Sequence, residues 1–209
     1  MKKFLVLGFG VLLASCAPAT TVRSYVDSSL TKASLSSGGI TVLPLLLGEG
    51  VKEANIPELR RELSKRTGDS IKTFFPSAKV VPLEQTLAIL SSGTLLDEYN
   101  AAANIFDTTG NLKADIMNKL TDASGTQYAI LPYLQSAYST TVVGAYGIRT
   151  TTYTAAFSMV IWDKKQQKTV YEGSGTASMT PTLLKPVNIL DTTYKAFDNA
   201  GAKISIDIK

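Results

Sequence analysis

Hydrophobic positions along the chain first follow the periods of a buried strand and a helix. Residues 40–45 are apolar at nearly every position, which is typical of a strand covered on both faces. Residues 55–75 carry apolar side chains at steps of three, four or eight, which predicts an amphipathic helix that ends before Pro76. Gly48 and Gly50 predict a loop between these two elements.

The middle of the chain continues the helical period, with a residue suited to an N-cap before several apolar runs. We expect Asn55 to cap the first helix, with Glu58 as its capping-box partner. We also expect Thr94, with Asp97, to cap a second helix and Asn188 to cap the last one. The pattern predicts a short strand at 78–81 and helices over 83–90, 94–106, 112–124 and 188–200.

From residue 127 the period becomes that of strands. Residues 127–133 form one apolar run, residues 153–161 alternate, and 169–179 return after the polar turn 163–168. The last isoleucines, at 204, 206 and 208, also alternate and predict an edge strand. Helices and strands therefore interleave before an antiparallel meander, and residues 40–209 are predicted to form a single α/β (α+β) domain with a mixed β-sheet flanked by helices.

The N-terminus has the organisation of an exported lipoprotein. Lys2 and Lys3 precede an apolar run, Phe4–Leu13, that is too short to span a bilayer. Small residues then lead to Cys16, the one cysteine of the chain. We interpret residues 1–15 as a signal peptide and Cys16 as the lipidation site. Because residue 17 is Ala rather than Asp, we expect the periplasmic face of the outer membrane in a cell with two membranes.

Residues 16–39 differ in composition from the rest of the mature chain. They are rich in Ser, Thr, Ala and Gly and poor in large apolar side chains. Such a segment buries too little apolar surface to order itself, so we expect a lipidated N-terminus followed by a flexible tether.

Composition excludes several kinds of chemistry. The chain has no His, which excludes Ser-His-Asp and Cys-His catalysis and imidazole metal sites. The single Cys, once acylated, excludes a disulfide within the chain. Lys and Arg number 21 against 17 acids, without a clustered basic run, so no nucleic-acid partner is expected. We expect no cofactor, no metal and no catalytic residue.

The stretch 136–152 is the candidate interaction loop. It is too long for an ordinary connection and carries apolar side chains that are costly to leave in water. Its candidate contact residues are Tyr138, Val142, Val143, Tyr146, Ile148 and Arg149. A plain, slightly long β-hairpin is the alternative for the same residues.

Two other functions are compatible with parts of the chain. Four tyrosines, Tyr133, Tyr138, Tyr146 and Tyr153, flank the Ser/Thr-rich stretch and would suit a glycan or another small ligand. A hydrolase with paired carboxylates is the weaker alternative, because no motif frames any pair. Its candidates are Glu84, Asp97, Glu98, Asp107 and Asp115.

Taken together, these motifs resemble the periplasmic α/β domain shared by the curli-secretion lipoprotein CsgG, the penicillin-binding-protein activator LpoB and the exopolysaccharide lipoprotein PelC. The matching parts are the cysteine signal, the strand at 40–45, the helix 55–75, the segment 125–131, the strand pair around 163–168 and the helix 188–200. The resemblance implies a non-catalytic assembly or interaction module in envelope biogenesis or secretion. It implies a membrane contact through lipid and a protein partner or self-association.

Overall fold

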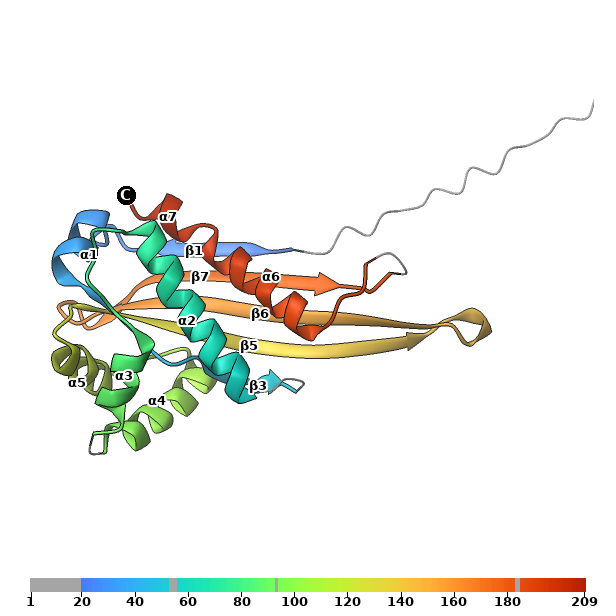
Figure 1. Cartoon of the computed structure of the whole chain (residues 1–209), viewed down its shortest axis with the longest axis horizontal. Coiled ribbons are helices and arrows are strands. Elements are labelled where there is room, and N and C mark those ends of the chain that lie inside the picture. Colours follow the sequence, from blue (N-terminus) through green and yellow to red (C-terminus); the bar gives the residue numbers. More distant parts are fainter. Residues whose placement is uncertain (1–19, 53–55, 93, 183–184) are drawn as a thin grey trace, which may run out of the picture.

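The computed structural model describes residues 20–52, 56–92, 94–182 and 185–209, and in them a mixed sheet is flanked by helices on both faces (Figure 1). The strands are β1 (Val22–Val26), β2 (Ile40–Val42), β3 (Leu46–Val51), β4 (Val80–Val81), β5 (Tyr128–Val143), β6 (Arg149–Asp163) and β7 (Lys168–Met179). The helices are α1 (Lys32–Gly38), α2 (Ile56–Phe74), α3 (Leu83–Leu90), α4 (Leu95–Thr109), α5 (Ala114–Ser124), α6 (Ile189–Gly201) and α7 (Ile204–Asp207).

Strand β5 is the axis of the sheet. The order is β1-β7-β6-β5-β2-β4, and β3 pairs with the second part of β5. The pairs β1–β7, β7–β6 and β6–β5 are antiparallel, whereas β5–β2, β5–β3 and β2–β4 are parallel. The predicted α/β fold with a mixed sheet and an antiparallel meander is confirmed.

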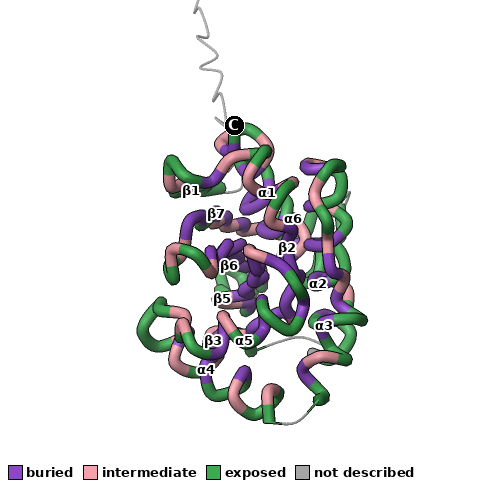
Figure 2. Tube along the Cα trace, turned by 90° about the vertical axis from the view of Figure 1, so that its left-hand side faces the viewer, coloured by how far each residue is buried: buried purple, intermediate pink, exposed green. Residues whose placement is uncertain are grey.

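Each face of the sheet has its own core. Helices α2 and α6 pack on one face through residues such as Leu63 and Phe197. Helices α3, α4 and α5 pack on the other face, where Trp162 and Tyr133 meet Phe106. Strand β5 sends Ile130 to the first core and Leu131 to the second, which explains an uninterrupted apolar run. Buried residues gather along these central strands (Figure 2).

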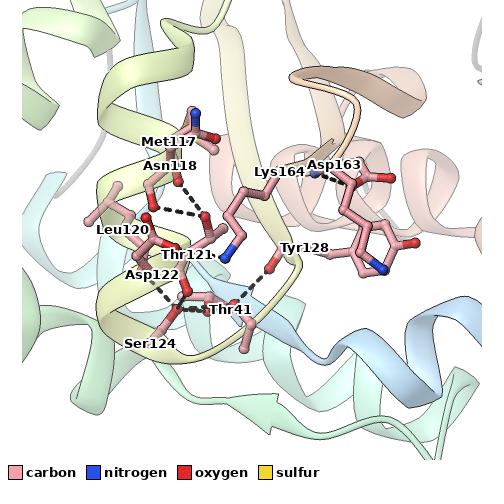
Figure 3. A network of polar contacts seen from close by, with 12 residues as sticks. Thr41, Met117, Asn118, Leu120, Thr121, Asp122, Ser124, Tyr128, Asp163 and Lys164 are labelled. Atoms are coloured by element: carbon pink, nitrogen blue, oxygen red, sulfur yellow. Dashed lines mark hydrogen bonds and ion pairs between the residues drawn. The ribbon is translucent and has the colours of Figure 1, made fainter.

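A buried cluster of hydroxyl groups joins the helix α5 to the start of β5 (Figure 3). The hydroxyl of Thr41 donates to Ser124 Oγ at 2.6 Å and lies 2.7 Å from Thr126 Oγ1. Thr126 in turn donates to the backbone carbonyl of Tyr128. Gly125 makes this turn possible, because its φ of 63° lies in the left-handed region. The cluster satisfies polar groups that would otherwise be costly to bury.

The predicted flexible tether at 16–39 is wrong for its described part. Strand β1 pairs with β7 from Val22↔Gly175 to Val26↔Tyr171, and α1 begins with a capping box at Thr31. Leu30 and Leu35 are buried in the first core. The segment is ordered because backbone hydrogen bonds to a sheet edge do not require apolar side chains. The ordered domain therefore begins before residue 40.

Two smaller expectations also need correction. The closing isoleucines lie in and directly after a helical turn, α7, whose C-cap is Ile208. Ile204 and Ile208 are buried and Ile206 is exposed. Gly48 and Gly50 lie in strand β3 rather than in a loop. Glycine is required at both positions because a Cβ would lie 2.5 and 2.9 Å from the carbonyl oxygen of Gln135.

Of the predicted caps, Asn188 is confirmed, since it forms a reciprocal capping box with Asp191. Thr94 makes no capping bond to the backbone, and its hydroxyl instead donates to Glu98. Asn55 lies outside the described residues.

Candidate functional site

The stretch 136–152, predicted as an interaction loop with a slightly long β-hairpin as the alternative, is the outer part of a long β-hairpin. Strands β5 and β6 pair without a break from Ser136↔Ala156 to Val143↔Arg149. The third strand of the meander ends earlier, because the last β6–β7 pair is Tyr153↔Met179. The final rungs of the hairpin are thus held by β5 and β6 alone. They extend beyond the helices (Figure 1).

Burial ends where the hairpin leaves the body of the domain. Ala137 and Ala155 are fully buried in the first core. Every residue from 140 to 150 is exposed. Val142, Val143 and Ile148 each expose more than 60% of their surface, and Tyr146 is 100% exposed. The hairpin therefore presents its apolar side chains to solvent rather than to the protein's own core.

Threonine hydroxyls form hydrogen bonds between the arms of the hairpin and from β6 to the end of β7. Thr141 and Thr151 are hydrogen-bonded across the strands at 2.9 Å, and Thr152 bonds to Thr180 at 2.9 Å. Further in, Thr154 bonds to Ser178 of β7. Because β-branched residues favour strands and these pairs satisfy one another, the arms do not depend on the apolar tip residues for their shape.

The turn at the tip contains a strained residue. The backbone N–H of Gly144 donates to the carbonyl of Ile148 at 2.8 Å and closes a short turn over 144–148. Within it Tyr146 adopts φ 62°, ψ 20°, in the left-handed region. A non-glycine residue held there costs on the order of 1 kcal/mol. The turn thus holds a large aromatic ring in solvent at an energetic cost.

The candidate residues are distributed over both faces of the hairpin. Tyr138 faces Thr154 and Val142 faces Thr150, which places these side chains on one face. Val143 and Arg149 are a pair on the opposite face. The tip is accordingly apolar on two sides, with the Arg149 cation beside the turn.

The four tyrosines proposed as a ligand platform do not come together. Tyr133 is buried and donates a hydrogen bond to Asp107. Tyr138 and Tyr153 lie on opposite faces of the hairpin, because Tyr153 pairs with Ser139, the neighbour of Tyr138. Tyr146 is alone at the turn. Burial and the hydrogen bond to Asp107 raise the pKa of Tyr133, so this hydroxyl stays protonated as a donor.

The acids of the helical middle do not form a catalytic pair in the described structure. Glu98 accepts from Lys119 Nζ at 2.6 Å, and this bond lowers the pKa of Glu98. Asp107 accepts from the Tyr133 hydroxyl and from the backbone N–H of Glu49. Glu84, Asp97 and Asp115 are exposed. A general acid needs a raised pKa, which Glu98 lacks.

The described part of the chain contains neither a metal-ligand cluster nor a membrane-spanning helix. No three His, Cys, Asp or Glu side chains gather among those residues as a metal site would require. None of the helices that they form is long and apolar enough to cross a membrane. The expected lipidation site, Cys16, lies outside the described residues.

Comparison with known proteins gives a fold but no family. No family model matches the chain, and no curated protein matches it. Among solved structures, a leucine-to-methionine variant of the PelC dodecamer from Paraburkholderia phytofirmans is similar, with a TM-score of 0.50. It is 10% identical, and the match covers 90% of this chain and 96% of that one. At this identity the likeness shows the fold alone.

Two weaker matches are a lipoprotein from Neisseria meningitidis and the C-terminal domain of LpoB from Escherichia coli. The lipoprotein is 16% identical over 72% of this chain and 87% of that one, with a TM-score of 0.43. The LpoB domain is 8% identical over 72% of this chain and 97% of that one, with a TM-score of 0.36.

Sequence reasoning identified the apolar tip residues but missed the arrangement that exposes them. The threonines at 140, 150, 151 and 152 were a signal for strand, because β-branched residues favour that conformation. No sequence pattern predicted the left-handed conformation of Tyr146, since Tyr rarely adopts it.

Proposed function

We propose that this protein is a non-catalytic lipoprotein of the bacterial envelope that works through protein–protein contacts made by the tip of its β5–β6 hairpin. Cys16 carries the lipid and anchors the chain to the periplasmic face of the outer membrane. The hairpin tip, defined as residues 142–148 with Arg149, contacts further copies of the same chain or another envelope protein.

The observation that carries this proposal is the exposed apolar tip. Val142, Val143, Tyr146 and Ile148 are close in sequence at the tip and solvent-exposed, on both faces of the hairpin. Exposed apolar side chains gathered in this way are typical of an interaction surface. The strained turn at Tyr146 supports the same interpretation, because strain that persists in a fold is commonly linked to function.

Self-association is the first partner to test. The PelC structure that shares this fold is a dodecamer, which shows that the fold is compatible with a ring of subunits. A hairpin that extends beyond the helices can reach a neighbouring subunit without rearrangement of either core. Arg149 would supply a polar contact at the edge of such an apolar interface.

A non-catalytic role is supported by the residues available for chemistry. The chain lacks His, its one Cys is the expected lipid carrier, and the acids of the helical middle are exposed or hydrogen-bonded. Function then depends on position at the membrane and on surface contacts.

Lipid anchorage is tested by detergent phase partitioning of the wild type and Cys16→Ser. We expect the wild type in the detergent phase and the variant in the aqueous phase, because acyl chains contribute about 0.8 kcal/mol for each buried CH₂. Alanine at Ser15 would be a matched control that keeps the thiol and a small residue. Equal partitioning of wild type and Cys16→Ser would refute the anchor.

The contact role is tested by changing Val142, Val143, Tyr146 and Ile148 together to Ser. We expect the native mass of the detergent-extracted protein to fall to that of the monomer, or a co-purifying partner to be lost, with an unchanged unfolding midpoint. The matched control is Ile206→Ser, which removes an equally exposed isoleucine far along the chain. A collapse in stability, or an unchanged assembly, would contradict the proposal.

A further inference from the structure

A second surface, unrelated to the hairpin, is an apolar groove bordered by α2, α3, α4 and the connection from β2 to β3. Its volume is about 490 Å³. Pro44 and Leu45 line it from the connection, and Leu46 and Leu47 line it from the start of β3. Leu83, Leu87 and Leu96 line it from α3 and α4. Figure 1 shows α2, α3 and α4 away from the hairpin tip, which extends beyond them. Pockets of this size and apolarity are typical of small-molecule sites.

Polar groups in the floor of the groove are already satisfied. The hydroxyl of Ser64 accepts from the backbone N–H of Leu45 at 2.8 Å and donates to the carbonyl of Arg60 at 2.6 Å. The hydroxyl of Tyr99 donates to the carbonyl of Pro44 at 2.8 Å, and burial raises the pKa of Tyr99. The floor therefore offers an apolar surface and leaves little for a polar ligand to bind.

Two arginines lie at the edge of this apolar floor. Arg60 and Arg61 line the groove from α2 and are exposed. On the same helix Lys65 pairs with Asp69 and Arg66 pairs with Glu62, whereas Arg60 and Arg61 take part in no ion pair with the described residues. Guanidinium groups bind carboxylates and phosphates through paired hydrogen bonds.

Leucines also remain exposed at the groove. Leu87 is 42% and Leu96 is 44% exposed, although both lie beside the buried floor. Asn100, Ala103 and Asn104 also line the groove from α4. The groove thus combines an apolar floor, uncovered leucines and a cationic edge.

We infer that the groove binds an amphiphile with one acyl chain and an anionic head group, such as a long-chain carboxylate. The acyl chain covers Leu47, Leu87 and Leu96, and the anion lies against the guanidinium groups of Arg60 and Arg61. Charge complementarity selects an anionic head, because a neutral one would leave both guanidinium groups without a partner in the site. The inference does not depend on the role of the hairpin.

Binding is tested with dansylaminoundecanoic acid, a fluorescent fatty acid, on the full chain carrying Cys16→Ser, which needs no detergent. We expect saturable binding of one molecule per chain and weaker binding of the corresponding primary amide. The double variant Arg60→Gln/Arg61→Gln should lose about tenfold or more in affinity for the acid, in line with the loss of charge-assisted hydrogen bonds. Its affinity for the amide should not change.

The matched control is Lys65→Gln/Lys72→Gln, which removes the same charge from α2 at positions that do not line the groove. Ala103→Phe, which fills the groove from α4, should abolish binding of both probes, and circular dichroism checks its fold. Displacement by palmitate or by lysophosphatidylglycerol identifies a free carboxylate or a lipid phosphate as the natural head group. Non-saturable binding, or equal losses in the arginine and lysine variants, would overturn the inference, as would displacement only by an acidic peptide.

Discussion

Asp27 is a single residue that secures the N-terminal strand to the sheet. Its carboxylate accepts from Lys168 Nζ at 2.6 Å and from the backbone N–H and hydroxyl of Ser29 at 3.0 and 2.7 Å. The bond from Lys168 is the main cause, followed by the Ser29 bonds, of a pKa of Asp27 well below its usual 3.8. The pair joins the end of β1 to the start of β7.

We predict that this link makes stability depend on acidic pH. A carboxyl whose pKa is lower in the folded than in the unfolded chain stabilises the fold above its unfolded pKa, near 3.8, and loses that effect as pH falls toward the folded pKa. Asp27→Asn should therefore lower the thermal midpoint at pH 7, and the difference from the wild type should shrink below pH 4. A difference that is constant from pH 7 to pH 3 would contradict this assignment.

Helix α6 packs on β7 more closely than side chains would permit. A Cβ on Gly175 would lie 2.4 Å from the backbone nitrogen of Ala200 and 2.8 Å from the carbonyl of Ala196. A Cβ on Gly173 would lie 2.7 Å from the carbonyl of Ala200. The glycines of β7 thus set the distance between this helix and the sheet. That distance brings Phe197 edge-on against Phe157, with ring centroids 5.2 Å apart.

We predict that Gly175→Ala destabilises the fold by about 1–3 kcal/mol, because overpacking forces the helix away from the sheet. Gly144→Ala is the matched control, since its new Cβ would find the nearest atom at 3.6 Å. Urea unfolding of both variants measures the effect. Equal changes in the free energy of unfolding for the two variants would contradict a close contact between Gly175 and α6.

The whole molecule depends on its first described strand and helix. Strand β1 covers the edge of β7 that would otherwise be open, and an open edge invites pairing with other chains. Leu30 lies between β1 and α1, and Leu35 lies in α1. Both are buried in the core beneath α6 and α2. These residues belong to the domain and are part of its stability.

We therefore predict that a chain starting at Ile40 is less stable than one starting at Thr20 by at least about 3 kcal/mol, the contribution of two buried leucines. The shorter chain should also aggregate, because it exposes β7. Chemical unfolding and light scattering of the two chains measure both effects. Equal stability would restore the interpretation of residues 20–39 as a tether.

The hydrophobic periodicity of single segments predicts much of the fold. The helices at 56–74 and 189–201 and the strands that begin at Ile40 and Tyr128 follow from periodicity, because each buries a face or both faces against a core. At the candidate surface the apolar tip residues were also identified from composition, since such side chains in a polar stretch need an explanation.

The sequence by itself determined the periodic helices and strands from residue 40 onward, and hence the α/β class, because burial leaves a periodic pattern of apolar side chains. Only the tertiary structure decided three other features. Strand β1 exists because a neighbouring edge offers backbone hydrogen bonds, which no side-chain pattern records. The isoleucines at 204 and 208 fit both an alternating strand and a helical step of four, and packing against the core selects the helix. The hairpin tip is exposed because β7 and α6 end before it, a property of its neighbours rather than of its own residues.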